Sequence, residues 1–547
     1  MHTMMNDPLT LLPILERAGT LFGTTQVVSR LPDRSLHRYT FADFYKRARQ
    51  LAECLTSAGL QRGDRVATLM WNHYVHFESY FGVPAAGGVL HPLNLRLHPR
   101  EIAYIVNHAQ DRFLIVDDVL LPVLEKFQPE VHFERVFVVR HCQNALPPGC
   151  EDYEGWLKEA TGHFKCPDLS EQDGASMCFT SGTTGNPKGV LYSHRSMVLH
   201  ALAETIADGA AVSMRDSILI GSSMFHVNAW GLPYSAATVG AKLVFPGPFL
   251  DAESVLDLIE QERVTLAGAV PTVWLPVVEL LESQKGRWPR AHDVRIMCGG
   301  TAPPESLIRA LDRHRLHILH AWGMTETSPS ATLSRLRPAM DDWPEDRKYA
   351  ARAKQGWPLP FVELRVMTPE GEAPRDGATM GELEIRGPWV ARSYFKAPET
   401  TQRWSSDGWF RTGDVAVMDP DGCIKLMDRT KDLIKSGGEW ISSVDLESSL
   451  MSHPAVREAA VIAIPHPKWQ ERPLAVVVLK DGMQAPKEEL RAFLGERFAK
   501  WQLPDDFVFV SELPHTSIGK LSKLELRKQF TDWQWPTSMP VVNDPRK

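Results

Sequence analysis

The chain lacks an apolar run long enough to cross a bilayer: no stretch of its 547 residues approaches the roughly 18 apolar residues that a membrane-spanning helix needs. Its first residues, MHTMMNDPLTLLPILERAG, have no basic start, and Pro13 and Glu16 interrupt their short apolar run. That pattern is not typical of a signal peptide. The chain ends in Asp-Pro-Arg-Lys, which is neither a peroxisomal nor a reticulum-retention signal. We therefore expect no transmembrane segment and no secretion.

Paired cysteines are also missing. The seven cysteines are scattered and form no C-x-x-C pair, so the sequence predicts neither a disulfide framework nor a cysteine zinc site. A reducing cytoplasm is the expected location. The cysteines are Cys54, Cys142, Cys150, Cys166, Cys178, Cys298 and Cys423.

An excess of positive charge is absent too. The net charge of −7 and the pI near 6.3 argue against nucleic acid or an anionic membrane surface as the main partner. The content of 43% hydrophobic and 23% charged residues is typical of a soluble globular protein. A chain of this length exceeds one ordinary core, so we expect two or more domains.

What the chain does contain is a loop suited to phosphate, at residues 180–189. It holds three glycines, four hydroxyl side chains and Lys188 within ten residues. Glycines allow positive φ and a close approach of backbone N–H groups to an anion, and hydroxyls and an ammonium add further donors. The spacing is not that of G-x-x-x-x-G-K-[ST], because Asn186 and Pro187 separate Gly185 from the lysine, which Gly189 follows. The sequence thus predicts a polyphosphate loop that is not a Walker A loop.

Helical and strand-like segments alternate through the first 170 residues, which predicts an α/β layered fold with largely parallel strands. We expect strands at 65–70, 113–116, 136–139 and 176–179, and helices over 40–60 and from Ser193 onward. Residues 267–272 and 296–303 are predicted as strands that end in turns, and 338–347 as an exposed loop.

The last third changes character near residue 428. We expect a half-exposed strand at 381–387, an acidic hairpin tip at Trp409–Asp414, and a returning strand at 424–427. Beyond 435, a compact α+β unit is predicted, with helices over 444–452 and 487–498 and strands over 459–464 and 474–479. Its final loop presents Lys520. The predicted domains are 1–428, a linker at 429–435, and 436–547.

Seven motifs occur in order along the chain: the loop at 180–189, F-H-x-N at Phe225, G-G-x-A-P at Gly299, W-G-M-T-E-T at Trp322, T-G-D at Thr412, D-R-x-K-D-x-I-K-x-G-G at Asp428, and G-K at Gly519. Together they resemble the signature series of the adenylate-forming superfamily of acyl-CoA synthetases, luciferases and adenylation domains. The fragment LIKSGGEWIS at 433–442 is most similar to bacterial medium- and long-chain fatty-acid–CoA ligases.

The resemblance implies ATP, Mg²⁺ and coenzyme A, in a reaction that passes through an acyl-adenylate. It assigns the nucleotide to Thr180, Ser181, Gly182, Thr183, Thr184, Gly185, Lys188, Gly300, Thr301, Ala302, Pro303, Trp322, Gly323, Met324, Thr325, Asp414, Arg429 and Lys435. Thr184 and Glu326 match the magnesium positions, since a hard cation takes oxygen ligands. Many relatives have tyrosine at the position of Trp322, so ring stacking is kept and a phenolic hydrogen bond is lost. Lys520 matches the lysine that acts in adenylation.

The small C-terminal domain of such enzymes swings about a hinge, and Lys431 stands at the hinge position. Ser436, Gly437 and Gly438 match the loop that lines the CoA channel in the second pose. Because proline fixes φ, Lys431→Pro is expected to keep adenylation and to block thioester formation. Similar enzymes are often homodimers, which the resemblance permits without requiring.

His226 on its own is more typical of a core histidine, but it matches the family histidine at the mouth of the acyl pocket. Candidate pocket walls are Val227, Ala229, Trp230, Gly231, Val270, Thr272 and Val273, and Trp440 matches a tryptophan that gates the fatty-acid tunnel. These walls favour an unsubstituted aliphatic acid. The same chemistry on a short thioether acid or an aryl acid, and a stand-alone enzyme that adenylates acids for a carrier protein, remain alternatives.

Overall fold

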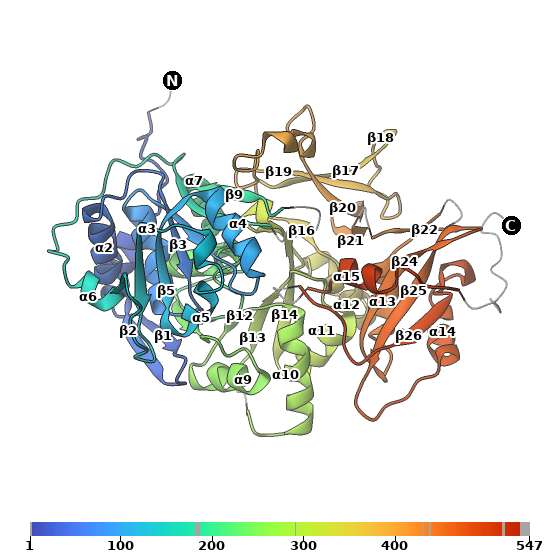
Figure 1. Cartoon of the computed structure of the whole chain (residues 1–547). Helices are drawn as coiled ribbons and strands as arrows, with labels where there is room; N and C mark the ends of the chain where they lie inside the picture. Colours follow the sequence, from blue (N-terminus) through green and yellow to red (C-terminus); the bar gives the residue numbers. More distant parts are fainter. Residues whose placement is uncertain are drawn as a thin grey trace.

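The computed structural model describes residues 3–180, 186–289, 292–429, 432–436, 439–516 and 520–535. A large N-terminal domain, blue to gold in Figure 1, lies beside a smaller C-terminal domain in orange and red. The predicted α/β fold with a large and a small domain is therefore confirmed. Within the described ranges, no helix is both long enough and apolar enough to span a membrane.

A seven-stranded sheet forms the first half of the large domain, in the order β7-β6-β5-β3-β4-β8-β9, and its strands from β3 to β8 run parallel. The strands are β3 (Arg65–Leu69), β4 (Val89–Pro92), β5 (Asp111–Asp117), β6 (Arg135–Val139), β7 (Cys150–Asp152), β8 (Gly174–Phe179) and the antiparallel β9 (Gly189–Ser193). Helices α2 (Phe41–Ser57), α3 (Tyr74–Ala85) and α6 (Tyr153–Leu157) pack on one face, and α4 (Pro99–Ala109) and α5 (Leu121–Leu124) on the other, with short turns η1 (Asp118–Leu120) and η2 (Gln128–Glu130).

A nine-stranded sheet follows, in the order β16-β15-β14-β13-β12-β10-β11-β1-β2. The strands are β1 (Gln26–Arg30), β2 (Leu36–Thr40), β10 (Ser217–Ile220), β11 (Lys242–Phe245), β12 (Leu266–Gly268), β13 (Val294–Cys298), β14 (Leu316–Gly323), β15 (Ser330–Leu333) and β16 (Trp357–Pro358). The helices around it are α1 (Leu12–Leu21), α7 (His194–Thr205), α8 (Leu232–Val239), α9 (Ala252–Gln261), α10 (Pro271–Ser283), α11 (Glu305–Asp312) and α12 (Glu345–Ala353), with turns η3 (Val227–Gly231), η4 (Thr325–Thr327) and η5 (Pro338–Met340).

The expected loop at 338–347 is wrong in part, because η5 and the start of α12 lie within it. Pro344 precedes α12, whose first turn holds Glu345 and Asp346. A proline and two acids are typical of a helix start, where carboxylates oppose the positive end of the helix dipole. The charged composition of the segment masked this signal.

The third sheet of the large domain lies at the top of Figure 1, in the order β18-β17-β19-β20-β21. Its elements are β17 (Glu363–Thr368), β18 (Gly371–Glu372), β19 (Gly381–Arg386), β20 (Phe410–Met418), β21 (Ile424–Arg429) and the turn η6 (Pro398–Arg403). The expected hairpin tip at Asp414 is wrong, since Asp414 lies inside β20 and pairs with Arg429 of β21. The strand continues past Gly413 because the four residues that follow Asp414 are apolar and buried.

The C-terminal domain has a sheet of its own, in the order β23-β22-β25-β24 with β26 beside β25. Its elements are β22 (Ile434–Ser436), β23 (Glu439–Ile441), β24 (Val456–His466), β25 (Gln470–Leu479), β26 (Asp506–Phe509), α13 (Ser443–Leu450), α14 (Lys487–Gly495), α15 (Lys523–Gln529) and η7 (Lys500–Gln502). The chain changes sheets between Arg429 and Ile434. Arg472 is fully buried and donates two hydrogen bonds, of 2.7 and 2.8 Å, to the Asp505 carboxylate.

Most predicted elements are confirmed within a few residues, because apolar periodicity and local caps agree. Thr40 caps α2 by accepting from the Asp43 N–H, in a capping box, and Ser193 caps α7 by accepting from the Ser196 N–H. Such hydroxyl caps satisfy N–H groups that have no partner inside the helix.

Candidate active site

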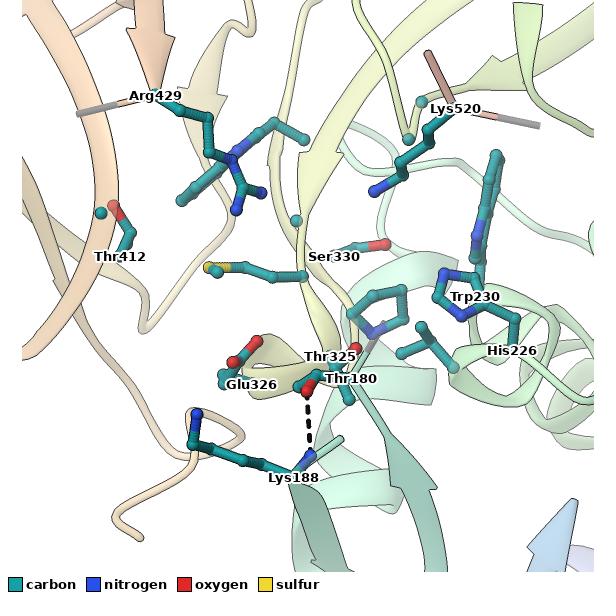
Figure 2. Close-up of a pocket in the computed structure, with 18 of the residues that line it drawn as sticks. Thr180, Lys188, His226, Trp230, Thr325, Glu326, Ser330, Thr412, Arg429 and Lys520 are labelled. Carbon is teal, nitrogen blue, oxygen red and sulfur yellow. Dashed lines mark hydrogen bonds between the residues drawn. The ribbon is translucent and has the colours of Figure 1, made fainter. Parts of the chain in front are cut away.

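Side chains of the large N-terminal domain and Lys520 of the C-terminal domain meet around one cavity of about 370 Å³. Figure 2 shows Lys520 and Arg429 at one end, and Glu326, Thr180 and Lys188 at the other. The cations that line it outnumber the acids among the described residues, which favours an anionic ligand such as a polyphosphate. Charged lining residues are Lys188, Glu326, Arg403, Arg429 and Lys520.

The phosphate loop closes on itself at its two ends. The N–H of Thr180 donates to the Lys188 carbonyl at 2.9 Å, and the N–H of Lys188 donates to the Thr180 hydroxyl at 3.1 Å, the dashed line in Figure 2. Both residues and Asn186 line the cavity. Ser181, Gly182, Thr183, Thr184 and Gly185, which were predicted to hold the nucleotide, lie outside the described residues.

The carboxylate of Glu326 is buried beside this loop. Its Oε1 accepts a hydrogen bond of 2.5 Å from the Tyr394 hydroxyl, and the Lys188 ammonium lies 5.9 Å from the centre of the Tyr394 ring. Burial and the Glu326 charge raise the pKa of the Tyr394 phenol, so the phenol stays protonated and donates. The sequence analysis missed Tyr394, because no motif marks it and only the tertiary fold brings it to Glu326.

Asp414 of β20 pairs with Arg429 of β21, which lies at the end of the site opposite the phosphate loop (Figure 2). Arg429 Nε lies 2.8 Å from Asp414 Oδ1, and the indole N–H of Trp322 donates to Asp414 Oδ2 at 3.2 Å. The tryptophan therefore supplies a hydrogen bond of its own where a phenolic one was expected to be lost. Gly323, Met324 and Thr325 continue from Trp322 along the cavity wall.

Lys520 enters the site from the C-terminal domain. Its stem passes Gly300 of the N-terminal domain so closely that a methyl group there would meet Lys520 Cε at 3.4 Å. Burial and the nearby Arg429 guanidinium lower the pKa of the Lys520 ammonium to about 8. An anion bound next to the ammonium would replace part of the hydration that it has lost and would stabilise its charged form.

His226 lies across the cavity from Arg429, below Lys520 in Figure 2. Burial and the charge of Lys520 lower the pKa of the His226 imidazole to about 3, so the ring is neutral at physiological pH. A neutral imidazole can position a carboxylate through a hydrogen bond without neutralising it. The functional assignment of His226 stays a prediction, although its place on the cavity wall differs from that of a core histidine.

The turn after His226 is left-handed. Val227, Asn228, Ala229 and Trp230 all have φ between 46° and 59°, and Gly231 follows at 78°. Left-handed conformation costs an L-residue roughly 1–2 kcal/mol each. Contacts hold the turn: Asn228 Oδ1 accepts from the Ser176 hydroxyl at 2.9 Å. The turn directs Val227 and Trp230 into the cavity wall, and periodicity alone gives no sign of it.

Some residues assigned to the site line a second cavity, of about 340 Å³, between the two domains. Gly300, Lys520 and Arg429 line both cavities, whereas Asp414, Thr301, Ala302 and Thr272 line only the second. Pro303 is buried next to them and lines neither. Val270 approaches the site, since a Cβ on Gly300 would lie 3.2 Å from it, while Val273 packs into the apolar core around α10.

Ser436, the described residue of the loop assigned to the CoA channel, lines neither cavity, and the same holds for Trp440 and Lys435. Ser436 is buried and accepts from Arg472 at 2.9 Å. Trp440 is 42% exposed, and Lys435, assigned to the nucleotide, is exposed with its ammonium 5.4 Å from the Trp440 ring centre. Gly437, Gly438 and the hinge residue Lys431 lie outside the described residues.

Comparison with known families now decides the family. The model of the AMP-binding enzyme family matches residues 17–395. The chain belongs to this family. The model of the AMP-binding enzyme C-terminal domain matches residues 445–520, so each domain of this AMP-binding enzyme contains a matched segment, and Lys520 ends the second one.

Similar proteins cover nearly the whole AMP-binding enzyme. A long-chain-fatty-acid–CoA ligase of Thermus thermophilus is 48% identical over 97% of each chain. A 3-methylmercaptopropionyl-CoA ligase of Ruegeria pomeroyi is 42% identical over 97% of this chain and 98% of that protein. Among solved structures, an anthranilate CoA ligase in complex with anthranoyl-AMP superimposes with a TM-score of 0.84 at 25% identity, over 96% of this chain and 98% of that one.

Proposed function

We propose that this AMP-binding enzyme is an ATP-dependent acyl-CoA synthetase, which converts a medium- to long-chain fatty acid through an acyl-adenylate to acyl-CoA, AMP and pyrophosphate. One observation carries the proposal. Lys520 of the small domain meets Arg429, Glu326 and His226 at a single cavity that has cations at both ends and an apolar wall at Trp230 (Figure 2). Such a cavity suits the joining of a carboxylate to a nucleotide phosphate.

The nucleotide would lie along the cavity between the phosphate loop and Asp414. Lys188 and Thr180, with the five loop residues that follow Thr180, would bind the β- and γ-phosphates. Asp414 would accept from both ribose hydroxyls, fixed for that role by Arg429 and Trp322. Gly300, Thr301, Ala302 and Pro303 would border the adenine.

The residues present also fit a magnesium ion. Glu326 offers a buried carboxylate whose Oε1 is already fixed by Tyr394, and a hard divalent cation prefers oxygen ligands beside phosphate. Glu326 and Thr184 would hold the ion, which when bound would neutralise phosphate charge.

In the adenylation step a carboxylate oxygen bonds to the α-phosphorus and the bond to the leaving pyrophosphate breaks. His226, neutral and hydrogen-bonding, would orient the carboxylate. Lys520 would lie between that carboxylate and the α-phosphate and stabilise the charge that builds on the phosphoryl oxygens. Removal of one preorganised donor of this kind typically costs about 10²–10³-fold in rate.

The second half-reaction would need another pose of the small domain. We propose that residues 429–435, with Lys431 as the pivot, let this domain turn so that Ser436, Gly437 and Gly438 replace Lys520 and line a channel for CoA. The exposure of Trp440 and Lys435 in the present pose agrees with a surface that has its partner elsewhere.

The acid itself is proposed from the wall residues. Val227 and Trp230 are apolar, and an apolar wall favours a hydrocarbon chain over a second charged group on the acid. Each buried methylene contributes about 0.8 kcal/mol, or roughly fourfold in kcat/KM, until the pocket is full. We therefore expect kcat/KM to rise steeply with chain length and then level off.

A series of kcat/KM values over C4 to C18 acids, with 3-methylmercaptopropionate and an aryl acid added, tests this choice. A rise through the medium or long chains supports the fatty acid. A maximum at the thioether acid would assign the enzyme to the chemistry named for its Ruegeria relative, and a maximum at the aryl acid would assign the same ligase chemistry to an aryl substrate. Adenylation without transfer to free CoA would point to a carrier protein as the acceptor.

A further inference from the structure

The carboxyl ends of the strands in the seven-stranded sheet hold a second polar cluster. Strands β3 and β5 are neighbours, but the chain leaves β3 toward β4 on one side and leaves β5 toward β6 on the other. In doubly wound sheets such a switch point opens a crevice that binds ligands. Three residues from three connections meet here, and none of them lines either cavity of the active site.

The three residues are His73, Asp117 and His141. His73 caps α3, Asp117 ends β5, and His141 lies two residues past β6. His73 Nε2 lies 2.8 Å from Asp117 Oδ1, and His141 Nε2 lies 3.5 Å from the same oxygen. Their potential ligand atoms all lie within 4.8 Å of one another, and among the described residues this is the one such group of three or more.

The group is buried and carries an unused ligand atom. The side chains of His73, Asp117 and His141 are at most 3% exposed. His141 Nε2 points at the carboxylate but makes no hydrogen bond, a rare state for a buried imidazole.

The neighbourhood adds negative charge and lies close to the protein surface. Asp118 follows Asp117, and its Oδ1 is also buried without a hydrogen-bond partner. Asp118 Oδ2 accepts from the N–H of Cys142 at 2.9 Å, which fixes the loop that carries His141. Because Cys142 is exposed, the cluster lies only one residue from the surface.

We propose that His73, Asp117 and His141 form a binding site for a divalent transition metal of the zinc class, with a fourth position for water. Two imidazoles and a carboxylate are ligands that Zn²⁺ takes in proteins, with bonds of about 2.0–2.2 Å. Tetrahedral ligands at that bond length lie about 3.3 Å apart, so the two distances to Asp117, 2.8 and 3.5 Å, need only small adjustment. The two histidine ligand atoms lie within 4.8 Å of each other and would approach to the same separation. The site joins three loops at the switch point and is separate from the magnesium position at Glu326.

Metal binding requires one rearrangement of protons. His73 Nδ1 accepts from the Val75 N–H at 3.2 Å, which places the ring proton on Nε2, where it faces Asp117. For Nε2 to bind a metal, that proton moves to Nδ1 through solvent, and the long cap hydrogen bond to Val75 is lost. The ring stays neutral, so the Asp117 carboxylate offsets one of the two positive charges of the metal.

The test uses the tag-free full-length protein, dialysed against chelator and then against metal-free buffer without ATP or Mg²⁺. Zn²⁺ is titrated by calorimetry, the bound metal is counted by elemental analysis, and Co²⁺ is used as an optical probe. We compare wild type with His141→Gln and with His73→Asn, since asparagine keeps the helix cap while it removes the imidazole. The matched control is His317→Gln. His317 also lies next to carboxylates, 2.8 Å from Asp312 and 3.3 Å from Asp293, but its side chain is partly exposed and it belongs to no proposed metal site.

We expect one Zn²⁺ per chain, a rise in Tm with Zn²⁺, and visible Co²⁺ bands of nitrogen and oxygen ligation without thiolate charge transfer. Each ligand variant should weaken binding at least about 100-fold, because even outer-shell changes at metal sites cost about 10–100-fold. The control should bind as wild type does. The proposal is overturned if wild type binds no Zn²⁺ at 100-fold excess over protein, if both ligand variants bind as wild type does, or if only the His317 variant loses binding. Pyrophosphate exchange, measured on each variant, reports on the proposed function independently of this result.

Discussion

The protonation of Lys520 gives a prediction that depends directly on the tertiary structure. A lysine in water has a pKa of 10.5, and burial beside Arg429 lowers the pKa of Lys520 to about 8. A pKa lowered from 10.5 to about 8 corresponds to roughly 3 kcal/mol, which is the order of the cost of holding the ammonium charged at this site instead of in water.

The direction in which activity changes with pH depends on which form of Lys520 is active. The charged ammonium stabilises the transition state, and a pKa of about 8 means that the charge is lost as pH rises through 8. The charged fraction is about 0.9 at pH 7, about 0.5 at pH 8 and about 0.1 at pH 9, for a single ionisation. We therefore expect kcat/KM for adenylation to fall about fivefold from pH 8 to pH 9 and about tenfold per pH unit beyond, because kcat/KM reports the free enzyme.

The assay is acid-dependent pyrophosphate exchange without CoA, at subsaturating ATP, from pH 6 to 10. Lys520→Ala should lower the rate about 10²–10³-fold and abolish the fall above pH 8. Lys520→Arg keeps its charge at all these pH values, so its activity, although lower, should not fall there. Thioester formation from supplied acyl-adenylate should largely survive in both variants.

Three results would refute this reasoning. A midpoint near the ordinary lysine pKa would show that Lys520 is not buried against Arg429 in the active pose. An unchanged fall above pH 8 in Lys520→Ala would assign the ionisation to another group. Equal losses in the two half-reactions would remove Lys520 from adenylation altogether.

Other substitutions test the walls of the site and the small domain. A Cβ at Gly231 would lie 2.6 Å from the imidazole of His200. Gly231→Ala should therefore destabilise the chain by about 1–3 kcal/mol and lower Tm. Gly286→Ala, at an equally positive φ with nothing within 4 Å, is the control and should cost only about 1 kcal/mol; equal shifts would disprove the clash. Arg472→Met leaves the buried Asp505 carboxylate unpaired, which typically costs about 3–5 kcal/mol, so limited proteolysis should cleave the small domain first and both half-reactions should fall. Tyr394→Phe removes the hydrogen bond to the buried carboxylate of Glu326, and KM for MgATP should rise about 10-fold. An unchanged KM would show that this bond does not position the Glu326 carboxylate.

Much of the fold could be predicted because local signals agree with global ones. Apolar periodicity and hydroxyl caps predict α2 and α7, and a run of β-branched and apolar residues predicts β5 and β6. The errors fell where a local pattern is ambiguous. Gly413 suggested a hairpin tip, but a strand continues through it because the following residues pack into a core.

The sequence by itself determined the reaction class. Ordered motifs mark groups that the chemistry requires, such as a lysine within a glycine loop or an acid after T-G. These motifs can be recognised in the sequence without knowing how far apart the side chains lie. Tyr394, the left-handed turn after His226, and the Trp322–Asp414 hydrogen bond were decided only by tertiary structure. Each depends on contacts between residues distant in the chain. The pKa of Lys520 depends in the same way on burial against Arg429 from another domain, and so does the meeting of His73, Asp117 and His141 at one switch point.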